Sequence, residues 1–282
     1  MADTLTTTGV PTTSVDAPID AGTRSPIGEV LRDIARGGIA GIIVGIFVAG
    51  LGGRLVMRLA TILHEDTVGR TTEAGETIGA ITFSGTMALI TFGGLGMGLM
   101  AGVIWVIVRP WIPGRGLARA LAAGLLAVAL GTPALVQRAN PDFFILDHDP
   151  LVVAMLVGLV FAVGFSIALM DGWLDRHLPR PLSGGGKWTV VYAVVALLGV
   201  VLILPVVVSI MLSESDYRAT IRAGWALAAV GVCTLVWWEL RAHGRTAPPR
   251  WLTLAGRGAL LVAVVLGVIT SLPHIRSAMG FG

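Results

Sequence analysis

Two arginines, Arg54 and Arg58, stand four residues apart at the end of a long apolar segment. In an α-helix this spacing places both side chains on one face, where two guanidinium groups can bind a phosphate or a carboxylate. Acidic residues that can neutralise them follow at Glu73, Glu76 and Asp142. The sequence therefore predicts an arginine–carboxylate clamp that ties the loops to the first helix. The alternatives are a binding site for an anionic lipid headgroup or small anionic solute, and two side chains that simply snorkel to the membrane surface.

Histidine and carboxylates also occur together in two short clusters. Their members are His64, Glu65, Asp66, Asp147, His148 and Asp149. Imidazole and carboxylate groups suit a divalent metal, and the two clusters can meet in space. Adjacent residues rarely all point at one ion, however, and no HExxH or similar spacing is present. We therefore predict no metal site and a solvated acidic loop, and His64, Asp147, His148 and Asp149 are the residues that a metal would use.

Three further charged residues, Asp171, Glu239 and Arg257, fall at the ends of apolar segments. They can pair with one another as a gate, but a charge at the end of a membrane helix is tolerated best beside the headgroups. We predict the second arrangement. The moderately apolar segment 71–85, which is rich in Gly and Thr, is either a re-entrant loop or, as we expect, a surface turn that leads into the next helix.

Other residue types argue against an enzyme. All five histidines lie outside the centres of the apolar segments, and the single lysine, Lys187, lies at a segment boundary. This distribution gives no pair of haem ligands and no lysine for a Schiff base. CxxC, GxSxG and P-loop motifs are also missing. We predict no cofactor, and an intramembrane enzyme is the last of three hypotheses.

The composition defines the class of protein. Hydrophobic residues make up 55% of the 282 residues and charged residues only 13%, whereas soluble domains carry about 25% charged residues. The formal charge of +3 comes from basic residues spread beside the apolar segments and not from a basic block, so no nucleic-acid partner is predicted. The single cysteine, Cys233, excludes a disulfide within the chain.

The chain divides into a tail and one membrane domain. Residues 1–25 are rich in Thr, Ala, Asp and Pro and are predicted to be a disordered tail without a signal peptide. Residues 26–282 are predicted to form a single multi-pass transmembrane helical domain. At its start, residues 27–36 have apolar positions at helical spacing, which predicts a helix along the membrane surface.

Seven apolar segments are long enough to cross a bilayer, which takes about 20 helical residues. They are residues 37–63, 87–108, 117–136, 151–170, 188–212, 221–240 and 252–272. Most of the 20 basic residues lie on the side of the N-terminus, as do most of the tryptophans, which favour membrane interfaces. We therefore predict an all-α bundle of seven transmembrane helices, with a cytoplasmic N-terminus and an extracytoplasmic C-terminus.

Small residues recur at every fourth position in five of these segments. The rows are Gly37, Gly41, Gly45, Ala49 and Gly53; Gly94, Gly98 and Gly102; Ala123, Ala127 and Gly131; Ala154, Gly158 and Ala162; and Ala259, Ala263 and Gly267. Such rows let helix backbones approach closely in lipid, so they predict a tight bundle. Segment 188–212 is bulky and β-branched instead, and is predicted to face lipid or a partner protein.

The stretches GGRLVMRL and TEAGETIGAITFSG resemble segments of bacterial multi-pass membrane proteins, which implies a bacterial inner membrane but no particular activity. Our first hypothesis is a non-catalytic scaffold or accessory component of a membrane assembly, located in the cell membrane. The second is a transporter or binder of an anionic lipid or small solute that uses Arg54 and Arg58 on the outer side. The predicted partners are the lipid bilayer, other membrane proteins and an anionic lipid.

Overall fold

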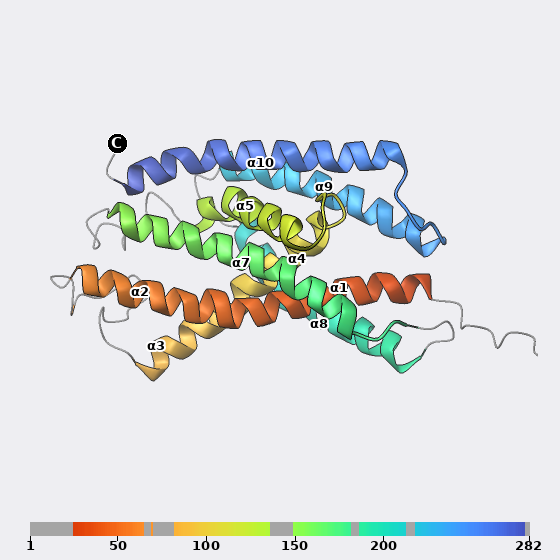
Figure 1. Ribbon diagram of the computed structural model, residues 1–282, viewed down its shortest axis with the longest axis horizontal. Coiled ribbons are helices and arrows are strands. Elements are labelled where there is room, and N and C mark those ends of the chain that lie inside the picture. The colour runs from red at the N-terminus through yellow and green to blue at the C-terminus, as the bar shows by residue number, and fades with distance from the viewer. Residues whose placement is uncertain are drawn as a thin grey trace, which may run out of the picture.

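The computed structural model describes residues 25–64, 69, 82–135, 149–181, 186–212 and 218–279. All regular secondary structure in these residues is helical, which confirms the all-α prediction. Figure 1 shows long helices stacked side by side with their axes near the long dimension of the molecule. Apart from Ser25, the tail predicted at residues 1–25 lies outside the described residues.

The described residues form a series of α-helices, two of which continue through π-helical segments. In chain order they are α1 (Pro26–Val44), η1 (Gly45–Gly50), α2 (Leu51–Leu63), α3 (Phe83–Ala88), η3 (Leu89–Gly96), α4 (Met97–Val108), α5 (Gly116–Leu135), α7 (Pro150–His177), α8 (Lys187–Leu212), α9 (Arg218–Ala242) and α10 (Arg250–Ala278), where η marks a π-helix. The elements α1, η1 and α2 form one continuous rod, and α3, η3 and α4 form a second.

Five of the helices are long and apolar enough to cross a membrane. They cover Pro26–Leu63, Gly85–Val108, Pro150–His177, Gly224–Ala242 and Arg250–Pro273. Two shorter apolar helices, Gly116–Thr132 and Lys187–Leu202, match the remaining predicted segments. Each of the seven apolar runs is therefore helical in its described part. The count of seven membrane crossings and the orientation of the termini stay predictions.

The N-terminal helix differs from the predicted surface helix at residues 27–36. Ser25 caps it, with its Oγ accepting a hydrogen bond from Gly28 N at 3.1 Å, and the helix then runs without a break into the first apolar segment. Its charged side chains point into the bundle, and Arg32 is only 2% exposed. The surface helix is wrong because these charged residues have buried partners, which a single amphipathic pattern cannot reveal.

The first two glycine rows pack against each other, which gives the close packing that the fourfold spacing predicts. A Cβ atom built on Gly41 would lie 2.8 Å from Gly102 Cα, and one built on Gly45 would lie 2.6 Å from Gly98 Cα. Both distances are shorter than real Cβ contacts, so only glycine lets the two backbones come this close. The π-helices η1 and η3 lie in the same contact, where Gly45 meets Gly94.

The remaining rows are confirmed only in part. Gly164 on α7 packs against Ala123 and Ala127 on α5, and Gly267 on α10 packs against the backbone of Ala129. The row predicted on the fourth segment does not make this contact, because Gly158 has no atom within 4 Å of its Cβ position. The contact surface of α7 is rotated away from that row, toward Val160 and Gly164.

Tryptophans fill part of the core and are not all interfacial anchors. Trp111 has no exposed surface, and its ring packs where a side chain on Gly256 would lie. Its Nε1 donates a hydrogen bond to Thr234 Oγ1 at 2.8 Å. Trp173 and Trp251 are exposed, as an interfacial position requires. The expectation of an interfacial ring is therefore wrong for Trp111, which joins α4 to α9 and α10 instead.

Candidate functional site: a buried charge network

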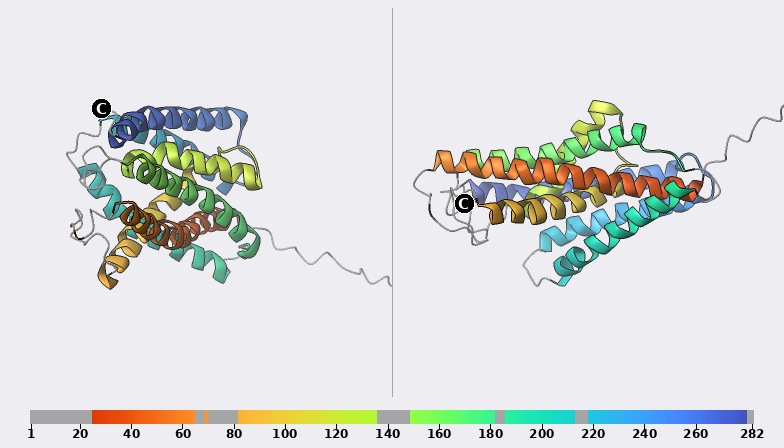
Figure 2. Two further views of the ribbon diagram at one scale, coloured as in Figure 1. Left: turned by 60° about the vertical axis from the view of Figure 1, so that its left-hand side comes forward. Right: turned by 90° about the horizontal axis from the view of Figure 1, so that it is seen from below.

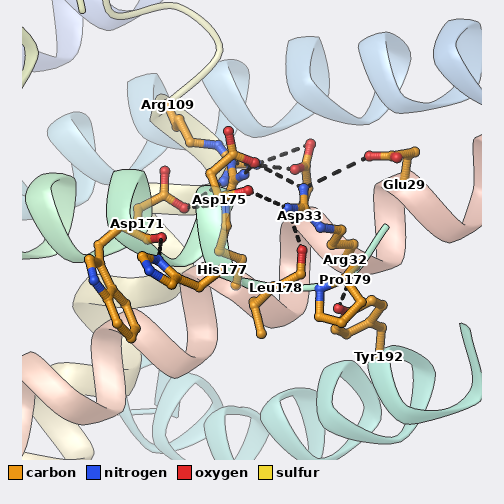
Figure 3. Close-up of polar contacts among 12 residues, drawn as sticks. Glu29, Arg32, Asp33, Arg109, Asp171, Asp175, His177, Leu178, Pro179 and Tyr192 are labelled. Carbon is orange, nitrogen blue, oxygen red and sulfur yellow. Dashed lines mark hydrogen bonds and ion pairs between the residues drawn. The ribbon is translucent and has the colours of Figure 1, made fainter. Parts of the chain in front are cut away.

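A network of ion pairs lies at the end of the bundle where α1 begins. Its centre is Asp171 on α7, a residue only 3% exposed. One carboxylate oxygen, Oδ1, accepts hydrogen bonds from Arg36 Nε at 2.6 Å and from Arg109 Nη1 at 2.8 Å. A single carboxylate thus holds guanidinium groups from two different helices. Figure 3 shows Asp171 and Arg109 pointing toward each other, with Asp33 and Asp175 beside them.

The second carboxylate of α7, Asp175, lies one turn further along the helix. Its Oδ1 accepts a hydrogen bond from Arg32 Nη1 at 2.9 Å and also pairs with Arg36. Nη2 of Arg32 donates to the backbone oxygens of Asp175 at 2.7 Å and of Leu178 at 3.1 Å. These bonds satisfy the last carbonyl groups of α7, which have no partner within the helix. Arg32 therefore fastens α1 to the end of α7.

A third carboxylate, Asp33, connects α1 with α4 and α9. Its oxygens lie 3.4 Å from Arg36 Nη2 and 3.2 Å from Arg109 Nη2, and it also pairs with Arg241 on α9. Arg241 in turn lies 3.8 Å from the carboxylate of Glu29. The three carboxylates together bring four helices to one point.

Arg109 is a buried cation of the network that contacts two of its carboxylates. It follows directly after α4 and is 5% exposed. Burial by itself would lower the pKa of Arg109, but the carboxylates of Asp33 and Asp171 outweigh this effect and raise the pKa above its ordinary value. The guanidinium group is therefore charged, and its charge is balanced inside the protein and not by solvent.

Arg119 supports the network from α5. It donates a hydrogen bond to the backbone oxygen of Arg109, and its guanidinium carbon lies 5.4 Å from the centre of the Trp105 ring. A cation over an indole face is a favourable contact. Through Arg119, a fifth helix contacts the charged end of the bundle.

Helical spacing explains how α1 contributes so many groups. Glu29, Arg32, Asp33 and Arg36 recur at intervals of three and four residues, so they share one face of the helix. Asp171 and Asp175 do the same on α7. Charges buried this deeply are costly unless they are paired, and the alternation of arginine and carboxylate provides that pairing. The arrangement can lock helices together, and it can open only if several pairs break at once.

The arginines predicted as an outer site lie at the opposite end of the α1–η1–α2 rod. Arg54 is half-buried and interacts with other residues, whereas Arg58 is exposed. Their predicted partners Glu73, Glu76 and Asp142 lie outside the described residues. The clamp and the anion site therefore both stay predictions.

The two predicted histidine–carboxylate clusters do approach each other. His64 Nε2 lies 2.9 Å from Asp149 Oδ2, which joins the end of α2 to the start of α7. Asp149 also caps α7, with its Oδ1 accepting a hydrogen bond from Leu151 N at 2.7 Å. Asp147 and His148 lie outside the described part of the chain. Within that part, no three potential metal ligands come together.

Of the three charged residues predicted to face headgroups, the expectation is wrong for Asp171. The structure places it inside the network, because Arg36 and Arg109 supply the charge that headgroups would otherwise supply. Glu239 and Arg257 are exposed, and their contact with headgroups stays a prediction. They do not join Asp171, so the alternative of a gate made from these three residues is also wrong.

From the sequence, the network residues of α1 are predicted only as part of a surface helix, the other arginines only as orientation signals, and Asp175 has no predicted role. Counting basic residues between apolar segments treats each arginine as an isolated positive charge. A signal is nevertheless present: Arg32 and Arg36 precede the first apolar segment, Asp171 and Asp175 follow the fourth, and each pair has the four-residue spacing of one helix face.

No protein-family model matches the sequence, and searches of curated proteins and of solved structures give no match either.

Proposed function

We propose that the chain is a cell-membrane protein with seven spans and a cytoplasmic N-terminus, and that it serves as a non-catalytic structural component of a membrane assembly. In this orientation the charge network lies at the cytoplasmic end. The proposal is supported by helices that are long and apolar enough to span a bilayer and by the excess of basic residues on the network side.

The observation that carries the proposal is the sharing of Asp171 between Arg36 and Arg109. Each of these groups is buried and paired with an oppositely charged partner, so these side chains act as ion pairs that join helices. A reacting group needs a form that can exchange a proton or attack a substrate, whereas a locked arginine–aspartate pair is suited to stiffness. A rigid bundle is what a scaffold needs.

The outer apolar surface supports the same proposal. Helix α8 exposes a row of large side chains, which includes Val190, Val194, Leu197 and Val201. This surface faces lipid or a neighbouring membrane protein, because no soluble phase would tolerate so continuous an apolar face. The row gives an assembly a place to dock.

The second candidate function is recognition of an anionic lipid or solute at Arg54 and Arg58. It is favoured by the exposure of Arg58 next to the exposed side chains of Leu55 and Leu59. A guanidinium group beside apolar surface fits the boundary between acyl chains and phosphates. On this candidate the site lies in the leaflet opposite the network.

One purification separates the two candidates. The tagged chain is extracted with a mild detergent and analysed by native mass spectrometry for bound proteins and lipids. A protein bound in fixed stoichiometry supports the scaffold. A chain that emerges alone and carries a phospholipid, lost on Arg54→Gln but retained on Arg257→Gln, refutes the scaffold and supports the second candidate. Arg257 is the matched control because it is an exposed arginine of α10 in the other half of the bundle.

The orientation has its own test. Cys233 is replaced by serine, and single cysteines are introduced at His243, on the network side, or at Phe83, on the other side; both positions are exposed. In intact cells a membrane-impermeant maleimide should label Phe83→Cys and should label His243→Cys only after lysis. The reverse pattern would refute the cytoplasmic N-terminus.

A further inference from the structure

An apolar pocket with a volume of about 370 Å³ lies between α1, α4, α8 and α9. Leu99, Val103, Val195 and Leu235 are among its lining residues. Helices α8 and α9 both pack against α1, but in the described residues they hardly contact each other. The right-hand view of Figure 2 shows the two helices extending away from the rest of the bundle. The pocket is therefore a gap between α8 and α9, which both pack against α1 but hardly contact each other.

Glycines from three helices create the space. A Cβ atom built on Gly38 of α1 or on Gly199 of α8 would have no atom within 4 Å. One built on Gly231 of α9 would meet only Ile107, at 3.9 Å. All three glycines line the pocket. At Gly41 and Gly98 a neighbouring backbone occupies the Cβ position. At the three pocket glycines no backbone does, so the missing side chains leave open space.

The lining does not suit water or a polar solute. Apart from the Trp238 indole, the one polar side chain is Thr234, and its hydroxyl is already used. It donates to the backbone oxygen of Ile107 at 2.6 Å and accepts from Trp111. A buried water needs two to four polar partners, and apolar cavities without them stay dry. A flexible apolar group from the bilayer fits this lining.

The end of the pocket nearer the charge network carries positive charge. Helix α8 begins at Lys187, which is exposed. Helix α9 approaches the same end, where Arg241 follows Trp238 by three residues on the same face. Arg241 pairs with Asp33 and Glu29 but keeps 28% of its side chain exposed. Arg245, also exposed, follows just beyond the end of α9. These cations complement an anionic headgroup placed at the membrane surface.

We propose that the pocket binds one acyl chain of an anionic phospholipid from the leaflet on the network side, with the phosphate beside Lys187 and Arg241. The site lies at the other end of the bundle from Arg54 and Arg58, so it is separate from the lipid site considered above. It goes beyond the scaffold role because the occupant is a lipid of defined charge held between α8 and α9. The bound chain fills the gap that these helices leave.

The test uses the full chain in phosphatidylcholine vesicles that contain a minor fraction of phosphatidylglycerol with a diazirine on its acyl chain. After irradiation, mass spectrometry maps the lipid adducts. The wild-type chain should carry adducts concentrated on the pocket-facing peptides of α8 and α9. Gly199→Leu should lose them, because leucine fills the open space. Gly258→Leu is the matched control, since Gly258 also has no atom within 4 Å but is exposed on α10.

Each result decides the proposal. Adducts that persist in Gly199→Leu, or that spread evenly over all exposed apolar faces, overturn it. Equal labelling by a phosphatidylcholine with the same diazirine overturns the requirement for an anionic headgroup. A cross-link from the pocket to a second protein chain shows a protein occupant and also overturns it. If Gly199→Leu does not elute as a folded species, Gly231→Leu makes the same measurement from the opposite wall.

Discussion

The carboxylate of Asp171 lies 2.6 Å from Nε of Arg36, although 135 positions separate the two residues in the chain. This contact joins the first long helix to a helix from the middle of the sequence. Because Arg109 shares the same oxygen, the pair is the centre of the network and not an isolated bridge. The stability of the bundle at this end therefore depends on the Asp171 carboxylate.

Removing the Asp171 carboxylate should be strongly destabilising. Asp171→Asn leaves Arg36 and Arg109 buried with fewer counter-charges, and breaking one member of a buried ion pair costs about 3–5 kcal/mol. We expect a clear fall in the midpoint of thermal unfolding in detergent, followed by the fluorescence of the buried tryptophans.

The control for this substitution is Glu239→Gln. Glu239 is also an acid near the end of a helix, but its side chain is 74% exposed, and among the described residues it pairs only with His243 in the turn after α9. An exposed pair of this kind contributes little, so the unfolding midpoint should not move. Equal effects of the two substitutions would refute a stabilising role for the network.

The close contact of the first two glycine rows predicts a sharp difference between neighbouring positions. Gly41→Ala forces a methyl group against Gly98 and Gly102 and should destabilise the protein by about 1–3 kcal/mol, as overpacking does. Gly38→Ala, three residues earlier on the same helix, meets open space and should be neutral or stabilising by up to about 1 kcal/mol. Unfolding in a denaturant series measures both. A harmless Gly41→Ala would contradict the backbone contact.

Thr234 should matter because two buried groups depend on its hydroxyl. Thr234→Val keeps the shape but leaves Trp111 Nε1–H without an acceptor, which costs about 1–3 kcal/mol, and the Trp111 emission should shift. Thr270→Val is the control, since the Thr270 hydroxyl bonds only to Leu266 O within its own helix. Comparable losses for both variants would show that Trp111 does not rely on Thr234.

The pair of His64 and Asp149 is suited to a double-mutant cycle. Asp149→Asn preserves a good helix cap for α7 but removes the charge that faces His64. We expect a coupling free energy of about 0.5–1 kcal/mol between Asp149→Asn and His64→Ala, measured at a pH low enough to protonate histidine. A coupling that is absent at low pH would contradict the contact.

The sequence predicts the helical class and close helix packing for clear reasons. Apolar runs of bilayer length specify helices, and the glycine spacing of Gly41, Gly45, Gly98 and Gly102 marks helix faces on which backbones can approach closely. These are local patterns, and each can be recognised in one segment without knowing which helix packs against it.

The charge network could not be predicted in the same way. Whether Arg36 faces headgroups or Asp171 depends on which helices are neighbours, and that is decided by packing over the whole bundle. The same limitation applies to the row at Gly158. Spacing shows which residues share a helix face, but it does not show whether that face turns toward a partner helix. The pocket between α8 and α9 is also a property of the assembled helices and not of any one segment.

The distance along the chain between network partners has a consequence for biosynthesis. Asp33 must wait for Arg241, made 208 residues later, and Arg36 must wait for Asp171. A membrane protein emerges from the ribosome in order, so the first helix appears with charges that only its own residues, such as Asp33 beside Arg36, can yet neutralise. It can settle at its final depth only when the later helices arrive, and a truncation before Asp171 should leave it exposed to quality-control proteases.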